Sequence, residues 1–349
     1  MNPALEQQKI DAPISPEPLL RALIGFEVSQ VLMTAHQLQI FETLAQGPQG
    51  IVELCESLGL PMHSGERLLN ACVSLNFLEI ENKKLKNSAA VGAYLDSRKS
   101  SYLGGLFDYY RTDVYASCAR LPEAILQNGP QVSDHEKGQA DVFTAMAHQK
   151  ELARRFHQAM HSLGLLEGKR LAEMYPFERI QHLVDVGGGS GALAISLAEQ
   201  YPHLEIDLVD HPTVCQTAEL FIEEAGLTSR IKTVPADFWK DPIPENVDAI
   251  LLSMVLHDWN PEECLRLLKN CANALKPGGQ ILIYEQLLNE DRQGPSLACL
   301  TNLIMLLRTR SGSEYTEMEY RAMLDQAGFH DMAVERRPGI RHLLHAKKR

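Results

Sequence analysis

Apolar side chains recur every three or four positions over most of the first 165 residues, which is the spacing of amphipathic helices. Within this stretch, 77–85 has the pattern of a β-hairpin with polar residues at its turn. Helices followed by a two-stranded ribbon are typical of a winged-helix domain. The pattern predicts helices at 19–45, 51–58, 65–75, 103–126 and 140–163.

The pattern changes after Glu167, where short β-rich runs begin to alternate with helical segments. This alternation predicts a parallel sheet with helices on both faces and a ligand site at the carboxyl ends of the strands. Strands are expected at 182–186, 205–210, 230–234, 247–252, 280–288, 332–337 and 340–348. The sequence therefore predicts a flexible arm at 1–17, a winged-helix-like domain at 18–170 and an α/β domain at 171–349.

Charge argues against a nucleic-acid partner. The chain has 33 Lys and Arg against 45 Asp and Glu, a net charge of −12, so a phosphate backbone is repelled. The helix expected at 65–75 carries Arg67 as its only Lys or Arg, whereas a DNA-recognition helix needs several. The apolar faces of the N-terminal helices favour a dimerisation platform instead.

Cysteine usage and hydropathy point to a cytoplasmic protein. The seven cysteines are scattered and form no C-x-x-C pair, so we expect them to be buried thiols. The N-terminus shows neither the basic nor the apolar region of a secretory signal. No apolar run approaches the ~18 residues needed to span a bilayer, so no membrane partner is expected.

A glycine-rich turn follows the first strand of the α/β domain. Gly187, Gly189 and Gly191 are spaced G-x-G-x-G, and this spacing alone leaves a dinucleotide cofactor open. Asp210 ends the next strand, 21 residues after Gly189, where a carboxylate can accept hydrogen bonds from ribose hydroxyls. Asp237, with Phe238 beside it, suits an adenosine without phosphates. The alternative is that Asp210 and Asp237 only cap local turns.

Six segments together resemble the motifs of S-adenosylmethionine-dependent small-molecule O-methyltransferases of the caffeate and hydroxyindole (acetylserotonin) type. They are LVDVGGGSGALA, DLVDHP, ADFWKD, VLHDW, LKPGGQILIYE and SEYT, and the resemblance extends over about 18–349. It implies a Rossmann-like class I methyltransferase domain behind a mainly helical winged-helix dimerisation domain, and hence a homodimer. It also implies that S-adenosylmethionine is bound by Gly187, Gly189, Asp210, Asp237, Phe238, Ser253 and Asp258.

The same resemblance makes His257 the general base and Glu285 and Glu314 its acidic partners. Methyl transfer from a sulfonium leaves a neutral thioether, so the remaining task is to accept the proton of the acceptor hydroxyl. His257 follows the strand at 247–252, and either glutamate could accept a hydrogen bond from its outer ring nitrogen. A structural histidine and a helix-capping Glu314 are the alternatives. No metal is expected, because the Asp and His residues are not at ligand spacing.

Apolar residues at helical intervals before the α/β domain could contact a planar acceptor, although such a stripe is more often core. This spacing makes Phe143, Phe156 and Met160 candidates, and the resemblance implies that Phe156, Met160, Met254, Met305 and Thr309 line the acceptor site. Met305 and Thr309 stand where the hydroxyindole enzyme is expected to present Asn and Gln, which argues against N-acetylserotonin as the acceptor.

The sequence thus predicts an O-methyltransferase for a hydroxyl of an aromatic or enolic small molecule. One alternative keeps the cofactor but performs hydroxylation, decarboxylation or pericyclic chemistry. A second is a ligand-sensing winged-helix regulator, and a third is an NAD-dependent oxidoreductase.

Overall fold

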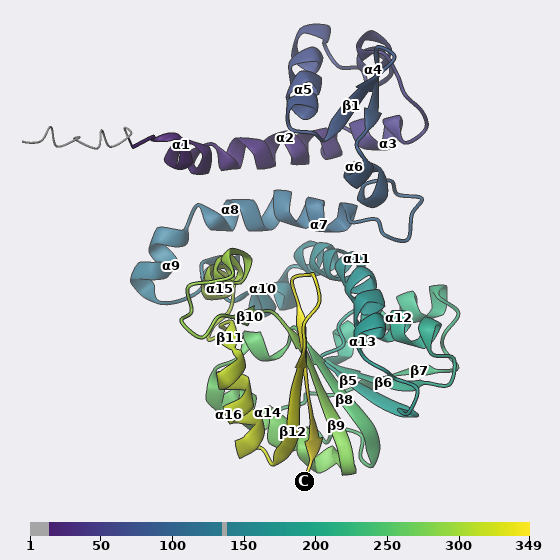
Figure 1. Ribbon diagram of the computed structural model, residues 1–349, viewed down its shortest axis with the longest axis vertical. Coiled ribbons are helices and arrows are strands. Elements are labelled where there is room, and N and C mark those ends of the chain that lie inside the picture. Colours follow the sequence, from purple (N-terminus) through teal and green to yellow (C-terminus); the bar gives the residue numbers. More distant parts are fainter. Residues whose placement is uncertain (1–13, 135–137) are drawn as a thin grey trace, which may run out of the picture. The chain divides into compact units, whose positions relative to one another are not determined.

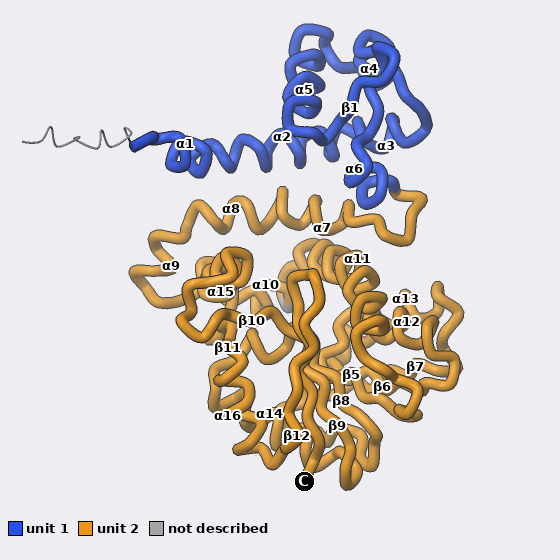
Figure 2. Tube along the Cα trace, in the orientation of Figure 1, with its two compact units in different colours: residues 1–96 blue, residues 97–349 orange. Residues whose placement is uncertain are grey.

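The computed structural model describes residues 14–134 and 138–349, so most of the arm expected at 1–17 lies outside the described residues. The chain forms two compact units, Met1–Asp96 and Ser97–Arg349 (Figure 1, Figure 2). This boundary lies earlier than the predicted one at 170/171. The long helix α11 (Lys150–Met174) packs along α12 (Ala192–Gln200), and a Cβ on Gly164 would lie 2.7 Å from that of Ala192. The helices from 97 to 170 therefore belong with the sheet.

The first unit has the helix and ribbon order of a winged helix. The helix predicted at 19–45 is divided into three segments. The first break lies at Ile24. The second lies at Leu38 and Gln39, where Gln39 adopts a left-handed φ of 58°. The hairpin turn has left-handed φ values at Asn82 and Lys83, as two-residue hairpin turns require. The elements are α1 (Glu17–Leu23), α2 (Gly25–Gln37), α3 (Ile40–Leu44), α4 (Ile51–Ser57), α5 (Met62–Ser74), β1 (Leu78–Glu81), β2 (Lys84–Asn87) and α6 (Ala89–Tyr94).

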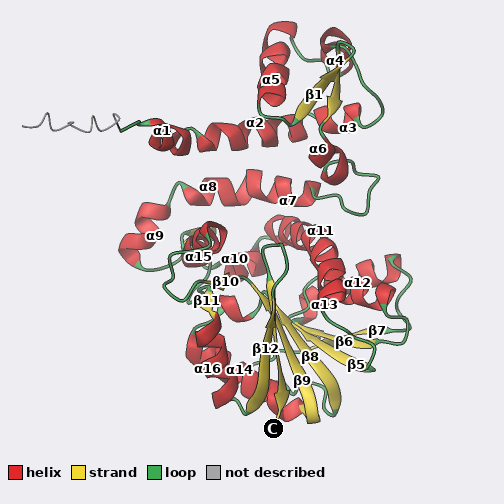
Figure 3. Cartoon of the chain, in the orientation of Figure 1, coloured by secondary structure: helices red, strands yellow, loops and turns green. Residues whose placement is uncertain are grey.

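A seven-stranded sheet forms the centre of the second unit, in the order β12-β13-β9-β8-β5-β6-β7 (Figure 3). Six strands run in one direction, and β13 runs antiparallel to its neighbours β9 and β12, so the expected parallel sheet is mixed at this end. The short connection from β12 to β13 is a hairpin, which reverses the chain. The strands are β5 (His182–Val186), β6 (Glu205–Asp210), β7 (Ile231–Pro235), β8 (Val247–Ser253), β9 (Leu275–Glu285), β12 (Phe329–Glu335) and β13 (His342–Lys348).

Apolar cores cover both faces of this sheet. Leu183 of β5 packs in one core with α11, α12 and α13 (Pro212–Glu224), whereas the adjacent Val184 packs in the other with α14 (Pro261–Ala274) and α16 (Glu317–Gln326). Alternate residues of a strand point to opposite faces, so a strand buried on both faces is apolar throughout. This explains why the strands were visible in the sequence.

The helix predicted at 103–126 is interrupted by a π-helical turn. Its elements are α7 (Gly104–Tyr109), η1 (Tyr110–Val114), α8 (Tyr115–Cys118) and α9 (Leu121–Gln127). The remaining ones are β3 (Val132–Asp134), β4 (Gly138–Ala140), α10 (Val142–His148), η2 (Leu256–Asp258), β10 (Leu287–Leu288), α15 (Ser296–Arg308) and β11 (Tyr315–Thr316). A third apolar cluster joins α7, α10, α11 and α15. No helix in the described ranges is long and apolar enough to cross a membrane. Of the seven free cysteines, Cys118 is exposed and Cys299 half-buried, against the expectation that all are buried.

Candidate active site

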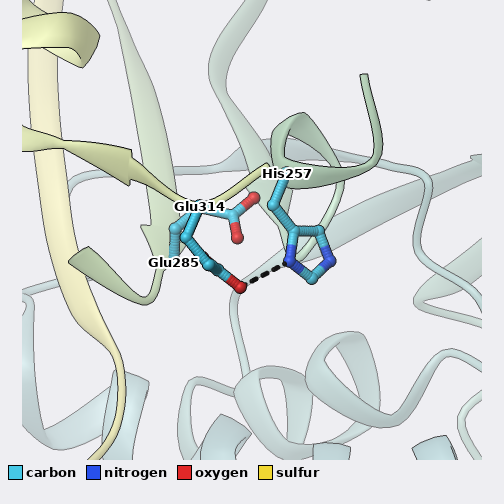
Figure 4. A group of neighbouring side chains, drawn as sticks. All are labelled: His257, Glu285 and Glu314. Atoms are coloured by element: carbon cyan, nitrogen blue, oxygen red, sulfur yellow. Dashed lines mark hydrogen bonds and ion pairs between the residues drawn. The ribbon is translucent and has the colours of Figure 1, made fainter. Parts of the chain in front are cut away.

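His257 and Glu314 form a buried hydrogen-bonded pair (Figure 4). Nδ1 of the imidazole lies 3.1 Å from Oε1 of Glu314, and the two residues are 5% and 0% exposed. A carboxylate accepts, so Nδ1 donates, and Nε2 is left as the nitrogen able to take a proton. His257 lies in η2, directly after the carboxyl end of β8.

A short strand pair brings the two glutamates to this histidine. β10 and β11 run parallel, with Leu287 opposite Tyr315. Glu285 ends β9 just before β10, and Glu314 immediately precedes β11, so the pairing sets both carboxyl groups beside η2. Both side chains are fully buried.

Glu285 forms hydrogen bonds with the backbone of the residues just before His257 and not with the imidazole ring. Its Oε1 accepts hydrogen bonds from the backbone N–H groups of Val255 at 2.9 Å and Leu256 at 3.1 Å. These groups begin the 3₁₀ turn and have no partner within it. Either glutamate was expected to be able to accept a hydrogen bond from the imidazole, and the one that does so is Glu314.

The loop after α15 also fixes this turn through backbone atoms. Ser313 donates its N–H to the carbonyl of His257 at 2.8 Å, and a Cβ on Gly312 would lie 2.5 Å from that carbonyl oxygen. Thr309 donates its hydroxyl to the Met305 carbonyl at 2.7 Å and accepts from Gly312 N–H at 3.0 Å. The hydroxyl of Thr309, a residue predicted to bind the acceptor, thus closes the end of α15.

The pKa of His257 is set by opposing effects. Burial lowers it, but Asp258, Glu285 and Glu314 outweigh burial and raise the pKa of His257 to about 10. Asp258 Oδ1 lies 3.8 Å from Nε2. Burial raises the pKa of Glu285 to about 7 and that of Asp258 to about 6. The neutral imidazole is therefore a strong base.

One ligand atom from each of His257, Glu285 and Glu314 lies within 4.8 Å of the others, a spacing that could hold a metal ion. The Oε1 atoms of both glutamates, however, already accept hydrogen bonds from the protein. Only their Oε2 atoms are buried without a partner in the described residues.

The glycine turn lies against this histidine segment. Gly187, Gly189 and Gly191 have φ values of 72°, 59° and 77°, in the left-handed region that side chains rarely adopt. A Cβ on Gly187 would lie 2.6 Å from Cγ2 of Val255. Asp210 at the end of β6 accepts the Gly189 N–H through Oδ2 at 2.9 Å. Backbone of the turn, the Asp210 carboxylate and the base thus share one edge of the sheet.

Two unpartnered polar atoms at this edge fit a polar nucleoside ligand. Asp185 Oδ2 and Ser253 Oγ are buried without a partner in the described residues, at the ends of the neighbouring strands β5 and β8. Gly189 leaves open space where a side chain would project. Asp237 instead binds Lys240 Nζ at 2.7 Å and Trp239 N–H at 3.0 Å, and Phe238 packs against the core and Trp259. The unpartnered oxygens of Asp185 and Ser253, together with the Asp210 carboxylate, suit the hydroxyl and amino groups of an adenosine-containing ligand.

Comparison with known proteins decides the family. The family model described as "O-methyltransferase domain" matches residues 118–330. A second model, described as "O-methyltransferase dimerisation domain", matches residues 20–103. The chain is 34% identical over 312 residues to the 3-hydroxy-5-methyl-1-naphthoate 3-O-methyltransferase of Streptomyces sahachiroi, covering 89% of each. It is 33% identical over 334 residues to human acetylserotonin O-methyltransferase, covering 93% of this chain and 95% of that one.

A solved structure agrees over the whole chain. The crystal structure of human N-acetylserotonin methyltransferase in complex with SAM has a TM-score of 0.86 and 31% identity, covering 98% of this chain and 99% of that one. The protein belongs to the O-methyltransferase family. It is an S-adenosylmethionine-dependent enzyme with a class I methyltransferase fold and an N-terminal dimerisation domain.

In this O-methyltransferase, two of the six residues predicted to bind the acceptor, Phe156 and Met160, pack against the third apolar cluster. Phe156 and Met160 of α11 are half-buried, and Phe156 meets the ring of Tyr109 edge-on at 5.6 Å. Phe143 is 40% exposed and Met305 half-buried. Met254 lies apart from this cluster, between β8 and η2, with a left-handed φ of 54°. Such a conformation is costly for a side-chain-bearing residue and is concentrated at active sites.

The sequence reasoning missed Arg308. This last residue of α15 is 4% exposed and donates to Tyr109 Oη at 2.6 Å and Ser117 Oγ at 3.0 Å. A cation at the end of the apolar run NLIMLL was the available signal. His161 was also missed: it stacks on Phe221 with ring centroids 3.7 Å apart and bonds Ser190 of the glycine turn at 3.0 Å.

Proposed function

We propose that this O-methyltransferase methylates a hydroxyl on a planar aromatic or enolic small molecule, with His257 as general base. When bound, S-adenosylmethionine supplies a methyl group on a sulfonium sulfur. Relatives named for a naphthoate and for acetylserotonin act on flat aromatic molecules, and the half-buried Phe156, Met160 and Met305 suit such a ring.

The observation that carries the assignment is the buried bond between His257 Nδ1 and Glu314 Oε1. It fixes the tautomer, so that Nε2 receives the proton of the acceptor hydroxyl, and it stabilises the imidazolium that results. Glu285 keeps the imidazole in place by holding the turn from which it projects.

The raised pKa of His257 brings the base close to the pKa of a phenol. A phenol has a pKa of about 10 and an ordinary histidine about 6.5, so deprotonation by an ordinary histidine would cost roughly 5 kcal/mol. Because the pKa of His257 is raised to about 10, transfer of the proton from a phenol to the neutral imidazole is close to thermoneutral. At pH 7 most His257 is already protonated, so forming the neutral base restores most of the cost, and activity should rise with pH.

The test is a methyl-transfer screen of phenols, indoles and hydroxyquinones, comparing the wild type with His257→Gln. We expect kcat to fall by about 10² to 10⁴-fold. Binding of S-adenosylhomocysteine, measured by calorimetry, should persist in the variant and shows that it is folded. Undiminished methylation by His257→Gln would refute the base assignment. No methylation of any hydroxyl by the wild type, with other products formed, would favour a non-methylating member of the family.

We also propose that the enzyme is a cytoplasmic homodimer joined through its N-terminal unit. Leu19, Leu20, Leu23 and Phe26 are each more than half exposed on α1 and α2, within the matched dimerisation domain. Such an apolar face is covered by a partner in a soluble protein. Leu23→Asp should therefore shift sedimentation toward the monomer, whereas Leu220→Asp, which changes an exposed leucine of α13, should not.

A further inference from the structure

We propose that the acceptor carries a carboxylate and that Arg308 binds it. This inference rests on the proposed function, because it names the class of hydroxylated aromatic molecule that the enzyme methylates. It begins from an arginine that is 4% exposed and is held by neutral groups, the hydroxyls of Tyr109 and Ser117.

Among the residues that the structure describes, the charges around Arg308 leave one positive charge without a counterion. Asp113 is the nearby carboxylate, but both of its oxygens bind Arg155, at 2.8 and 2.9 Å. In the described residues no carboxylate oxygen lies within 4 Å of the Arg308 guanidinium, which also packs over the Tyr109 ring at 5.3 Å. A buried ion without a partner is strongly destabilising, so an anionic ligand would complete the cluster.

The hydrogen-bonding capacity of Arg308 points the same way. A guanidinium has five N–H donors, and the described residues accept from two of them. Nη1 and Nη2 each retain a hydrogen, as does Nε. The planar fork of a guanidinium matches a planar carboxylate with two parallel hydrogen bonds, a geometry that a single phenol oxygen cannot reproduce.

Arg308 is placed to bind the far end of an acceptor whose hydroxyl meets His257. Tyr109, whose hydroxyl it binds, meets Phe156 edge-on, and Phe156 is a predicted acceptor-binding residue. Arg308 is also only four positions before Gly312, which lies against the carbonyl of His257. Four residues span at most about 15 Å, so a ring system of one to three fused rings could reach from the guanidinium to the base.

The experiment compares hydroxynaphthoic acids with their primary amides, which have the same shape without the charge. For the wild type we expect kcat/KM to favour the acid by about 10- to 100-fold, the range for a hydrogen-bonded ion pair. In Arg308→Gln this preference should fall to about onefold, and in Arg308→Lys it should be partly retained. Arg154→Gln is the matched control, because Arg154 is exposed on α11 beside Arg155 and its partners in the described part of the chain are Glu151 and Gln158.

Binding is measured as well, by calorimetry of the same acids and amides with S-adenosylhomocysteine present. Equal affinity of the wild type for acid and amide would overturn the inference, whether or not either is methylated. So would a preference for the acid that survives Arg308→Gln. Arg308-dependent binding of acids without methylation of any phenol would instead leave the inference standing and overturn the proposed function.

Discussion

Glu314 and His257 lie 57 residues apart in the sequence and meet through a 3.1 Å hydrogen bond that is closed to solvent. The carboxylate therefore acts on the ring in two ways. Its hydrogen bond orients the ring and fixes the tautomer, and its charge raises the pKa of His257. These two effects can be separated experimentally, because glutamine keeps an oxygen that accepts from Nδ1–H while removing the charge.

We expect Glu314→Gln to move the pH–rate profile to lower pH. Activity requires neutral His257, so the rate rises with pH through the pKa of this residue, and Glu314 is one of the groups that raise that pKa. The plateau rate should fall by about 10- to 100-fold, because the base is weaker and its cation less stabilised. The measurement is kcat against pH for one phenol. If the pH at which kcat is half-maximal did not change, Glu314 would have a structural role only.

Glu285 should show a different pattern, because it binds backbone rather than the ring. Glu285→Gln keeps an acceptor for the N–H groups of Val255 and Leu256 and should retain most of the stability. Glu285→Ala leaves both N–H groups buried and unpaired, at about 1–3 kcal/mol each. Chemical denaturation measures the free energy of unfolding. Both variants also remove a charge that raises the pKa of His257, so both should move the pH–rate profile to lower pH, and only the alanine variant should lose stability as well. An alanine variant as stable as the glutamine variant would contradict this role.

Gly187→Ala should weaken binding of S-adenosylhomocysteine. The new Cβ would strain a φ of 72° and lie 2.6 Å from Val255. Gly226→Ala is the control, since its φ is 70° but nothing lies within 4 Å of its Cβ. Both variants should lose about 1–2 kcal/mol of stability from the backbone alone. Calorimetry should show a loss of affinity only for Gly187→Ala, and equal affinities would remove this glycine from the binding turn.

Chelation should leave the reaction unchanged. The Oε1 atoms of Glu285 and Glu314 are occupied by N–H donors, and a neutral thioether leaving group needs no Lewis acid. The rate is to be compared before and after dialysis against EDTA, and after Mg²⁺ or Zn²⁺ is added back. Loss on chelation with recovery on adding Mg²⁺ would show that the three clustered side chains hold a metal during turnover.

Sequence patterns located the strands better than the helix breaks. The residues of β5 and β6 were predicted without error, because strands buried on both faces are apolar runs ended by turns. The break at Gln39 and the π-helical turn at 110–114 were missed, since tertiary packing rather than local periodicity decides them. In the site, the resemblance brought His257 and Glu314 together. It could not show that Glu285 binds backbone. It also could not show that Arg308 forms a hydrogen bond with Tyr109, which lies 199 positions earlier in the sequence.

One link between the loop after α15 and the base runs through main-chain atoms, from Ser313 N–H to the His257 carbonyl. A second runs through Asn302 of α15, whose Oδ1 accepts the Glu314 N–H at 2.9 Å. Side chains of α15 other than Asn302 can therefore be exchanged without breaking either link. A randomised library at Ile304, Met305 and Arg308 should broaden or redirect the acceptor range while the proton-transfer dyad stays intact. Helix α15 is thus a suitable target for directed evolution of acceptor specificity, with His257 and Glu314 left unchanged.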